Sequence, residues 1–137
     1  VDGLPKYLYS RGFRRADHLF GAHRHQSGAG RVVLVEGALD AVWLHQHGYT
    51  EAGALLGLYC SRQQQRLLAA LGDTVVLALD NDEAGVTASN QLVDMLGKRF
   101  NMRHVVLPEG IKDVQELGPE QLKEVLGARR YEWERLA

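Results

Sequence analysis

The chain has 137 residues, a formal net charge of −1, 45% hydrophobic residues and 24% charged residues. These values are ordinary for one globular domain with a sizeable core, and they indicate no class of partner by themselves. The single cysteine, Cys60, excludes an intramolecular disulfide and argues against a zinc site built from cysteines. No apolar run approaches the length of a membrane span, so we expect a cytoplasmic protein with no membrane partner. The chain begins at Val1 rather than Met, which suggests a fragment cut from a longer protein.

The first 27 residues form a basic segment ahead of the predicted core. Residues 1–31 contain two acidic residues and six basic ones, which are Lys6, Arg11, Arg14, Arg15, Arg24 and Arg31. Such a segment can contact an anionic ligand, or it can be an ordinary solvated surface. The stretch QSGAG at 26–30 predicts a flexible joint between this segment and the core.

Residues 28–130 alternate short apolar runs with helical patterns, and residues 131–137 form a tail. We predict strands over 31–37, 51–57, 74–79 and 103–108, and helices over 38–48, 61–72, 82–100 and 118–130. Strands that are separated by helices pair in parallel. Because the strong strands are continuously apolar, helices should cover both faces of the sheet. The predicted fold class is therefore α/β, with a Rossmann-like parallel sheet flanked by helices.

Acidic residues stand at or soon after the ends of three predicted strands. In chain order they are Glu36 and Asp40, then Asp80 and Asp82, then Glu109, Asp113 and Glu116. Because sites in parallel sheets lie beyond the carboxyl ends of the strands, these carboxylates should converge on one edge. Carboxylates that lie so close together repel each other and need a counter-charge. Lys112 is the nearest basic residue, but Mg²⁺ with oxygen ligands is the better candidate, and it suggests phosphate chemistry.

Simpler roles remain open for single members of this set. Asp80 or Asp82 can cap the helix that begins near residue 82, and Glu36 can lie solvated in a turn. Two glycines favour a ligand, because Gly37 and Gly85 would keep the space near the acids free of side chains.

The motifs VEGALDAVWLHQHGY (35–49) and DNDEAGVTAS (80–89) resemble the Toprim domain of primases, topoisomerases and some nucleases. The family pattern is Glu-Gly after the first strand and Asp-x-Asp after a later one. LPEGIKDVQEL (107–117) and LPKYLYSRGFRRADHLFGAHR (4–24) are similar to primase segments, so the resemblance covers residues 4–117. Gln115 departs from the Asp-Pro-Asp of chromosomal primases, and the run around it is closer to phage and plasmid helicase-primases.

The resemblance implies a role for each acid. Glu36, Asp80 and Asp82 would be the catalytic set, with Glu36 as a general acid/base or metal ligand and the two aspartates holding Mg²⁺ or Mn²⁺. Asp40 and Asp113 would be further metal ligands. The implied reaction is nucleotidyl transfer that makes RNA primers on single-stranded DNA during replication. In it, a primer 3′-hydroxyl attacks the α-phosphate of a nucleotide and pyrophosphate leaves.

The implied partners are a single-stranded DNA template and nucleoside triphosphates, with a replicative helicase as a further candidate. The contacts with DNA phosphates would come from basic side chains, namely Lys6, Arg11, Arg14, Arg15 and Lys112. Two other hypotheses remain open. One is a Toprim nuclease or topoisomerase that cleaves DNA with the same metals. The other is a non-catalytic Toprim module that binds nucleic acid.

Overall fold

A computed structural model describes residues 10–25 and 30–127 of the chain. Its strands are β1 (Arg31–Val35), β2 (Ala52–Ala54), β3 (Thr74–Leu77) and β4 (Asn101–His104). The α-helices are α1 (Ala38–Gln46), α2 (Arg62–Leu71), α3 (Glu83–Leu96) and α4 (Pro119–Leu126). Three short 3₁₀ helices complete the described elements: η1 (Arg15–Asp17), η2 (Ala22–Arg24) and η3 (Val114–Glu116). None of the described helices is both long enough and apolar enough to cross a membrane.

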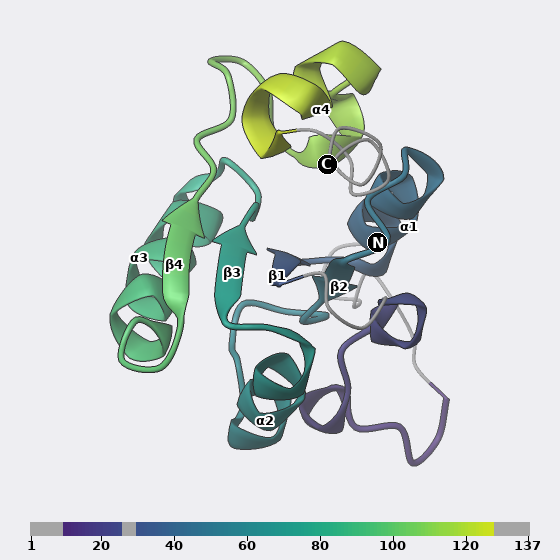
Figure 1. Ribbon diagram of the computed structural model, residues 1–137, viewed down its shortest axis with the longest axis vertical. Helices are drawn as coiled ribbons and strands as arrows, with labels where there is room; N and C mark the ends of the chain where they lie inside the picture. The colour runs from purple at the N-terminus through teal and green to yellow at the C-terminus, as the bar shows by residue number, and fades with distance from the viewer. Residues whose placement is uncertain (1–9, 26–29, 128–137) are drawn as a thin grey trace, which may run out of the picture.

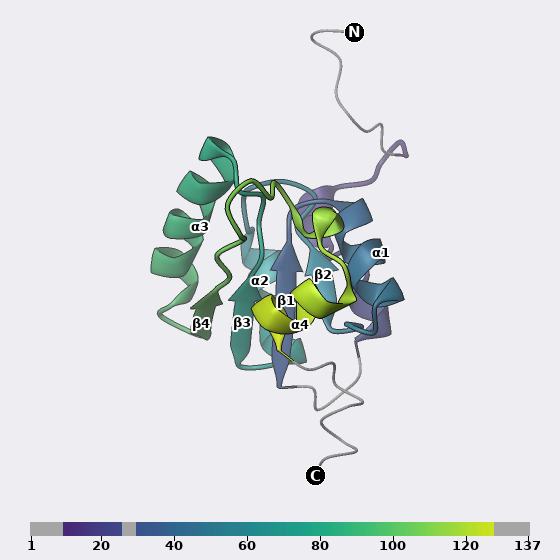
Figure 2. The ribbon, with the colours of Figure 1, turned by 90° about the horizontal axis from the view of Figure 1, so that it is seen from above.

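The four strands form one parallel sheet in the order β2-β1-β3-β4. Figure 2 shows all four arrows pointing the same way, so the carboxyl ends of the strands share one edge. In the register of the sheet, Val33 of β1 pairs with Ala52 on one side and with Val76 on the other. The predicted α/β class is confirmed, and β1 and β3 are direct neighbours. Residues that follow these two strands therefore start from adjacent positions at the same edge.

Each face of the sheet carries its own apolar core. On one face, alternate residues of β1 and β3 pack against α1 and α4, with Leu44 and Leu122 fully buried. On the other face, the remaining residues of these strands pack against α2 and α3, with Leu68 and Leu96 fully buried. Figure 1 shows the two pairs of helices on opposite sides of the sheet. Both faces are covered, which explains why β1 after Arg31 and β3 after Thr74 are continuously apolar.

The fourth strand differs from its prediction in position and burial. β4 covers Asn101–His104 rather than 103–108, and it lies at the sheet edge with β3 as its partner. The backbone N–H of Val105 still donates to the carbonyl oxygen of Leu77 at 2.8 Å, and there the chain leaves the sheet. Val106 is 79% exposed. The predicted strand was wrong beyond residue 104, because β3 ends at Leu77 and offers no partner to the rest of the apolar run.

The helix ends also differ from the prediction where glycine intervenes. α3 ends at Leu96 rather than at residue 100, and the N–H of Gly97 donates to the carbonyl oxygen of Val93 at 2.9 Å. α4 ends at Leu126 rather than at residue 130, and Gly127 has a φ of +80°. This positive φ departs from helical backbone and is readily adopted by glycine, so the helix ends here. The predicted helix residues 128–130 and the predicted tail lie outside the described residues.

The described part of the basic segment packs against the sheet and α2. Phe20 exchanges two backbone hydrogen bonds with Ala54, at 3.0 and 2.9 Å, along the outer edge of β2. The buried Gln64 amide of α2 lies within hydrogen-bond distance of three carbonyl oxygens, those of Arg15, His18 and Leu55. Residues 15–20 are therefore held by the core, while most of the predicted joint at 26–30 lies outside the described residues.

Arg31 does not belong to a solvated basic surface, contrary to its inclusion in the predicted basic cluster. Its side chain is buried and its Nε donates to Glu51 Oε2 at 3.0 Å. Its Nη1 donates to the carbonyl oxygen of Leu126 at 2.7 Å, at the C-terminal end of α4, where the helix dipole favours a cation. This ion pair joins the start of β1 to the residue before β2 and to α4.

Candidate metal centre

A cavity of about 200 Å³ lies at the carboxyl edge of the sheet, beyond the ends of β1, β2 and β3. Its lining includes four of the five predicted metal-binding acids and one predicted basic residue: Glu36, Asp40, Asp80, Asp113 and Lys112. The strand neighbours explain why these residues meet, because Glu36 follows β1 and Asp80 follows β3. The cavity is thus the one that the acidic strand ends predicted.

Three of these acids form a compact group. Asp40, Asp80 and Asp113 each offer one carboxylate oxygen, and these oxygens all lie within 4.8 Å of one another. Asp40 lies in the first turn of α1, Asp80 three residues after β3, and Asp113 at the start of η3. We call these three residues the carboxylate group. It combines segments that lie far apart in the sequence, and hard oxygen ligands of this kind suit Mg²⁺ or Mn²⁺.

The electrostatics of Asp80 show that the acids act on one another. Burial, and after it the negative charges of Asp40, Glu36, Asp113 and Asp82, together raise the pKa of Asp80 from 3.8 to about 7. The charges of the other four acids predicted as metal ligands therefore all reach the Asp80 carboxyl. A divalent cation among them would reverse this effect, because a positive charge favours the ionised carboxylate.

Asp40 is the most buried member of the carboxylate group, with 6% of its surface exposed. Both of its oxygens accept hydrogen bonds. The backbone N–H of Gly37 donates to Oδ2 at 3.1 Å, and the side-chain amide of Gln115 donates to Oδ1 at 2.7 Å. The backbone N–H of Gln115 also donates to Asp113 Oδ1 at 3.0 Å. Gln115 departs from the primase motif, and no sequence signal placed it at the site.

Asp82 is placed differently from Asp80. It is exposed and caps α3, and its Oδ1 accepts a hydrogen bond from the N–H of Gly85 at 2.7 Å. Asp82 is not a member of the carboxylate group, although its charge contributes to the raised pKa of Asp80. The capping role that the sequence left open therefore describes the geometry of Asp82. Its predicted part in catalysis and metal binding stays a prediction.

Gly85 has a packing role rather than the ligand-clearing role that we expected. A Cβ atom on Gly85 would overlap the backbone carbonyl oxygen of Asp80. The first turn of α3 thus packs directly against the backbone of Asp80. Only glycine permits such a close approach without a shift of one of the two segments.

The loop after β2 contributes a feature that no sequence signal indicated. Leu56 lines the cavity with a φ of +61°, which is uncommon for a residue other than glycine. Its N–H donates to the carbonyl oxygen of Glu36 at 2.8 Å. This bond ties the loop after β2 to the residue that follows β1, and so fixes the backbone of Glu36 beside the cavity.

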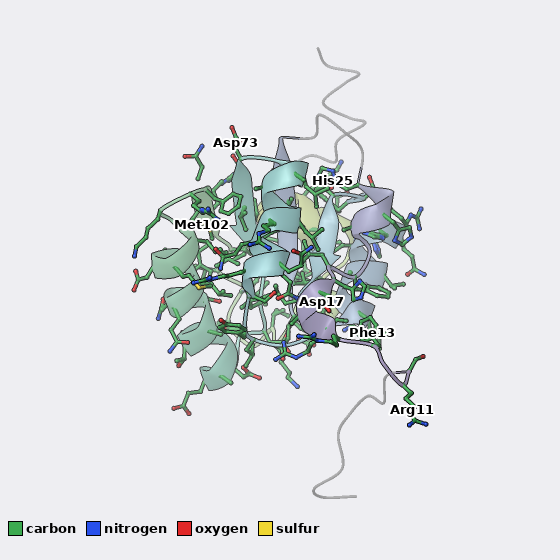
Figure 3. All side chains as sticks on the ribbon, turned by 90° about the horizontal axis from the view of Figure 1, so that it is seen from below. Arg11, Phe13, Asp17, His25, Asp73 and Met102 are labelled. Atoms are coloured by element: carbon green, nitrogen blue, oxygen red, sulfur yellow. The ribbon has the colours of Figure 1, made fainter. Side chains whose placement is uncertain are left out.

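The predicted basic residues lie at different distances from the acids. Lys112 lines the cavity, and Arg15 lies beside it, since a Cβ atom on the lining residue Gly57 would come within 2.6 Å of Arg15 Nη1. Arg14 is exposed, with its Nε 3.6 Å from an oxygen of Asp17. The exposed Arg11 projects away from the body of the protein in Figure 3. Lys6 lies outside the described residues.

One backbone hydrogen bond and one from a side chain hold the loop that carries Asp113 beside β3. The backbone N–H of Asn81 donates to the carbonyl oxygen of Lys112 at 2.6 Å. The side-chain amide of Asn81 donates to the carbonyl oxygen of Ile111 at 3.3 Å. The segment between Asp80 and α3 is thereby joined to the segment before η3. The carboxylate group therefore sits on segments that hold one another in place, as a metal centre requires.

Comparison with known proteins identifies relatives of this chain. It is 36% identical to the DNA primase of Deinococcus radiodurans over 117 residues, which cover 80% of this chain and 20% of the relative. It is 36% identical to the DNA primase of Thermotoga maritima over an alignment of 141 positions, which covers 94% of this chain and 25% of the relative. The chain therefore spans only about a fifth to a quarter of the length of these relatives.

Solved structures agree with this relationship. The zinc-binding and RNA polymerase domains of the Aquifex aeolicus primase superpose with a TM-score of 0.69 at 29% identity, covering 99% of this chain and 34% of that chain. A DnaG primase catalytic domain bound to single-stranded DNA gives a TM-score of 0.68 at 28% identity, covering 96% and 44%. A profile of the Toprim-like family matches residues 33–117, which include the carboxylate group. The chain belongs to the Toprim-like family.

Proposed function

We propose that this chain is the metal-binding catalytic portion of a DNA primase, which joins nucleotides into RNA primers on single-stranded DNA. The observation that carries the proposal is the carboxylate group, which lies inside the segment shared with the Toprim-like family. The relatives support the reaction class, since DNA primases match 80 to 94% of this chain at 36% identity. Mg²⁺ or Mn²⁺ is the proposed ion, since all the ligands are carboxylate oxygens.

In this proposal Asp40, Asp80 and Asp113 hold the ion, and Glu36 and Asp82 complete the acidic edge. A bound divalent ion would neutralise the triphosphate and stabilise the leaving pyrophosphate. Glu36 would accept the proton of the primer 3′-hydroxyl or bind an ion itself. The side chain of Lys112, which lines the same cavity, would attract the phosphates of the incoming nucleotide.

The proposed partners are a single-stranded DNA template and nucleoside triphosphates, with a replicative helicase as a further candidate. The DNA-bound DnaG primase domain, which is 28% identical to this chain, supports the first of these. Arg15 lies beside the cavity, and Arg14 and Arg11 are exposed. Lys6 is proposed as a further contact from the sequence alone. Affinity for single-stranded DNA should fall with rising salt concentration, because the proposed contacts are to phosphates.

The decisive experiment replaces the matched 117-residue stretch of the Deinococcus radiodurans primase by this chain and measures primer synthesis on single-stranded DNA. We expect Mg²⁺- or Mn²⁺-dependent synthesis of short RNA. Asp80→Asn in the same chimera should abolish it, whereas Asp94→Asn, at an exposed position of α3, should leave it unchanged. A folded chimera that makes no primers, while the parent primase does, would contradict the proposed activity.

The two alternative hypotheses are tested in the same reactions. A nuclease or topoisomerase would nick or relax supercoiled plasmid when Mn²⁺ is added, with the same dependence on Asp80. A non-catalytic module would bind single-stranded DNA but give neither primers nor cleavage. Primer synthesis without cleavage would exclude both alternatives.

A further inference from the structure

We propose that Gln115 is a positioning residue of the metal centre, which fixes the Asp40 carboxylate in the orientation that lets it share an ion with Asp80 and Asp113. This inference rests on the proposed metal binding. Gln115 reaches two members of the carboxylate group at once. Its side-chain amide donates to Asp40 Oδ1 at 2.7 Å, and its backbone N–H donates to Asp113 Oδ1 at 3.0 Å.

The bond to Asp40 helps to define the orientation of this carboxylate. Gly37 donates its N–H to the other oxygen at 3.1 Å. A carboxylate offers about four lone-pair sites, so an oxygen that accepts one hydrogen bond can still coordinate a metal ion. Hydrogen bonds of this kind, made to a ligand rather than to the metal, fix the direction of the ligand and strengthen metal binding. Without Gln115, Oδ1 of Asp40 would lose the donor that now lies 2.7 Å away.

The backbone around Gln115 is anchored independently of its side chain. Val114 and Leu117, on either side, are fully buried in the core. The indole N–H of Trp43 donates to the carbonyl oxygen of Leu117 at 3.0 Å. Removing the Gln115 amide should therefore leave η3 in place and change mainly the orientation of the Asp40 carboxylate. This makes a substitution at Gln115 a test of orientation rather than of folding.

The test is Mn²⁺ binding to the 137-residue chain, measured by calorimetry and by the electron paramagnetic resonance signal of free and bound Mn²⁺. Gln115→Met keeps the length of the side chain and removes its donor. We expect its Mn²⁺ affinity to be about 10- to 100-fold weaker than that of the unmodified chain. The matched control is Gln46→Met, an exposed position at the far end of α1 and about 12 Å along the helix axis from Ala38.

The outcomes separate the two proposals. If the unmodified chain binds Mn²⁺ and Gln115→Met binds it equally well, the positioning role is overturned while the metal centre stands. If the unmodified chain and both variants bind no Mn²⁺, the metal centre is overturned together with the positioning role. A weaker affinity in Gln115→Met alone, with the control unchanged, supports both.

A second variant gives a readout that does not depend on comparing affinities. Gln115→Glu keeps the size of the side chain but places a carboxylate beside Asp40 in place of a donor. We expect the metal-free melting temperature at pH 8 to fall, and the gain in melting temperature on adding Mn²⁺ to exceed that of the unmodified chain. A melting temperature and a Mn²⁺ gain equal to those of the unmodified chain would show that Gln115 does not act on Asp40, and would overturn the inference.

Discussion

Replacing Asp80 by Asn should stabilise the metal-free protein and abolish its response to a divalent metal. Burial and four neighbouring carboxylates raise the pKa of Asp80 from 3.8 to about 7. The folded state therefore binds more protons than the unfolded state between about pH 4 and pH 7. The corresponding stability is fully present below pH 3.8 and is lost as the pH rises through 7. Above pH 7 Asp80 is ionised in the metal-free protein, and its repulsion from the four neighbouring carboxylates is at its full strength.

The magnitude follows from the size of the shift. A change from 3.8 to about 7 corresponds to about 4 kcal/mol at full strength. Asp80 is only half-buried, and water screens a charge in this position, so we expect about 1 to 2 kcal/mol. For a chain of this size this is a rise of about 3 to 10 °C in melting temperature for Asp80→Asn at pH 8. The gain should shrink at pH 5, where Asp80 of the unmodified protein is already protonated.

The assay is thermal unfolding followed by circular dichroism in EDTA at pH 5 and pH 8, and then with Mn²⁺ in place of EDTA. The control is Asp94→Asn, which removes the same charge from an exposed site on α3. Mn²⁺ should raise the melting temperature of the unmodified protein and of the control, but not that of Asp80→Asn. Equal gains at pH 8 for the two variants, or a lower melting temperature for Asp80→Asn, would refute the repulsion argument.

Three further predictions concern the scaffold. Gly85→Ala should lower the free energy of unfolding by about 1 to 3 kcal/mol, because its Cβ would overlap the Asp80 carbonyl oxygen. The control Gly118→Ala, with no atom within 4 Å of its Cβ, should lower it less. Equal losses for the two variants in urea denaturation would contradict this reasoning. Gln64→Leu should cost about 2 to 4 kcal/mol in the same assay, because its amide lies against three carbonyl oxygens; a loss below about 0.5 kcal/mol would argue that residues 15–18 do not need it. Burial raises the pKa of the Cys60 thiol to about 12, so Ellman's reagent should label it at pH 8 only in denaturant; fast labelling of the folded protein would disprove this.

The layout of the sheet could be predicted from the sequence because it depends on local patterns. The apolar runs that became β1 and β3 are strand-like by composition, and helical periods separate them. Parallel pairing then brings the carboxyl ends of the strands to one edge, whatever the remaining details of the fold. For this reason the meeting of Glu36, Asp40, Asp80 and Asp113 around one cavity could be predicted before any coordinates were known.

The division of roles among the acids depended on tertiary contacts. Asp80 and Asp82 are equivalent in the motif, yet the start of α3 takes Asp82 as its cap and leaves Asp80 in the carboxylate group. Gln115 contacts Asp40 across 75 positions of sequence, and no local pattern encodes a contact of that range. By sequence Arg31 is one of six basic residues near the N-terminus, and only the fold shows that it is buried in an ion pair with Glu51.

The sequence by itself determined which elements form and at which edge the acids collect, because hydrophobic periodicity and the direction of parallel strands are local or nearly local properties. Only the tertiary structure decided the end of β4, the burial of Arg31 and the partners of Asp40. These depend on which segments happen to lie within hydrogen-bond distance after the chain has packed, and a hydrogen bond is too short-ranged to be inferred from composition or spacing.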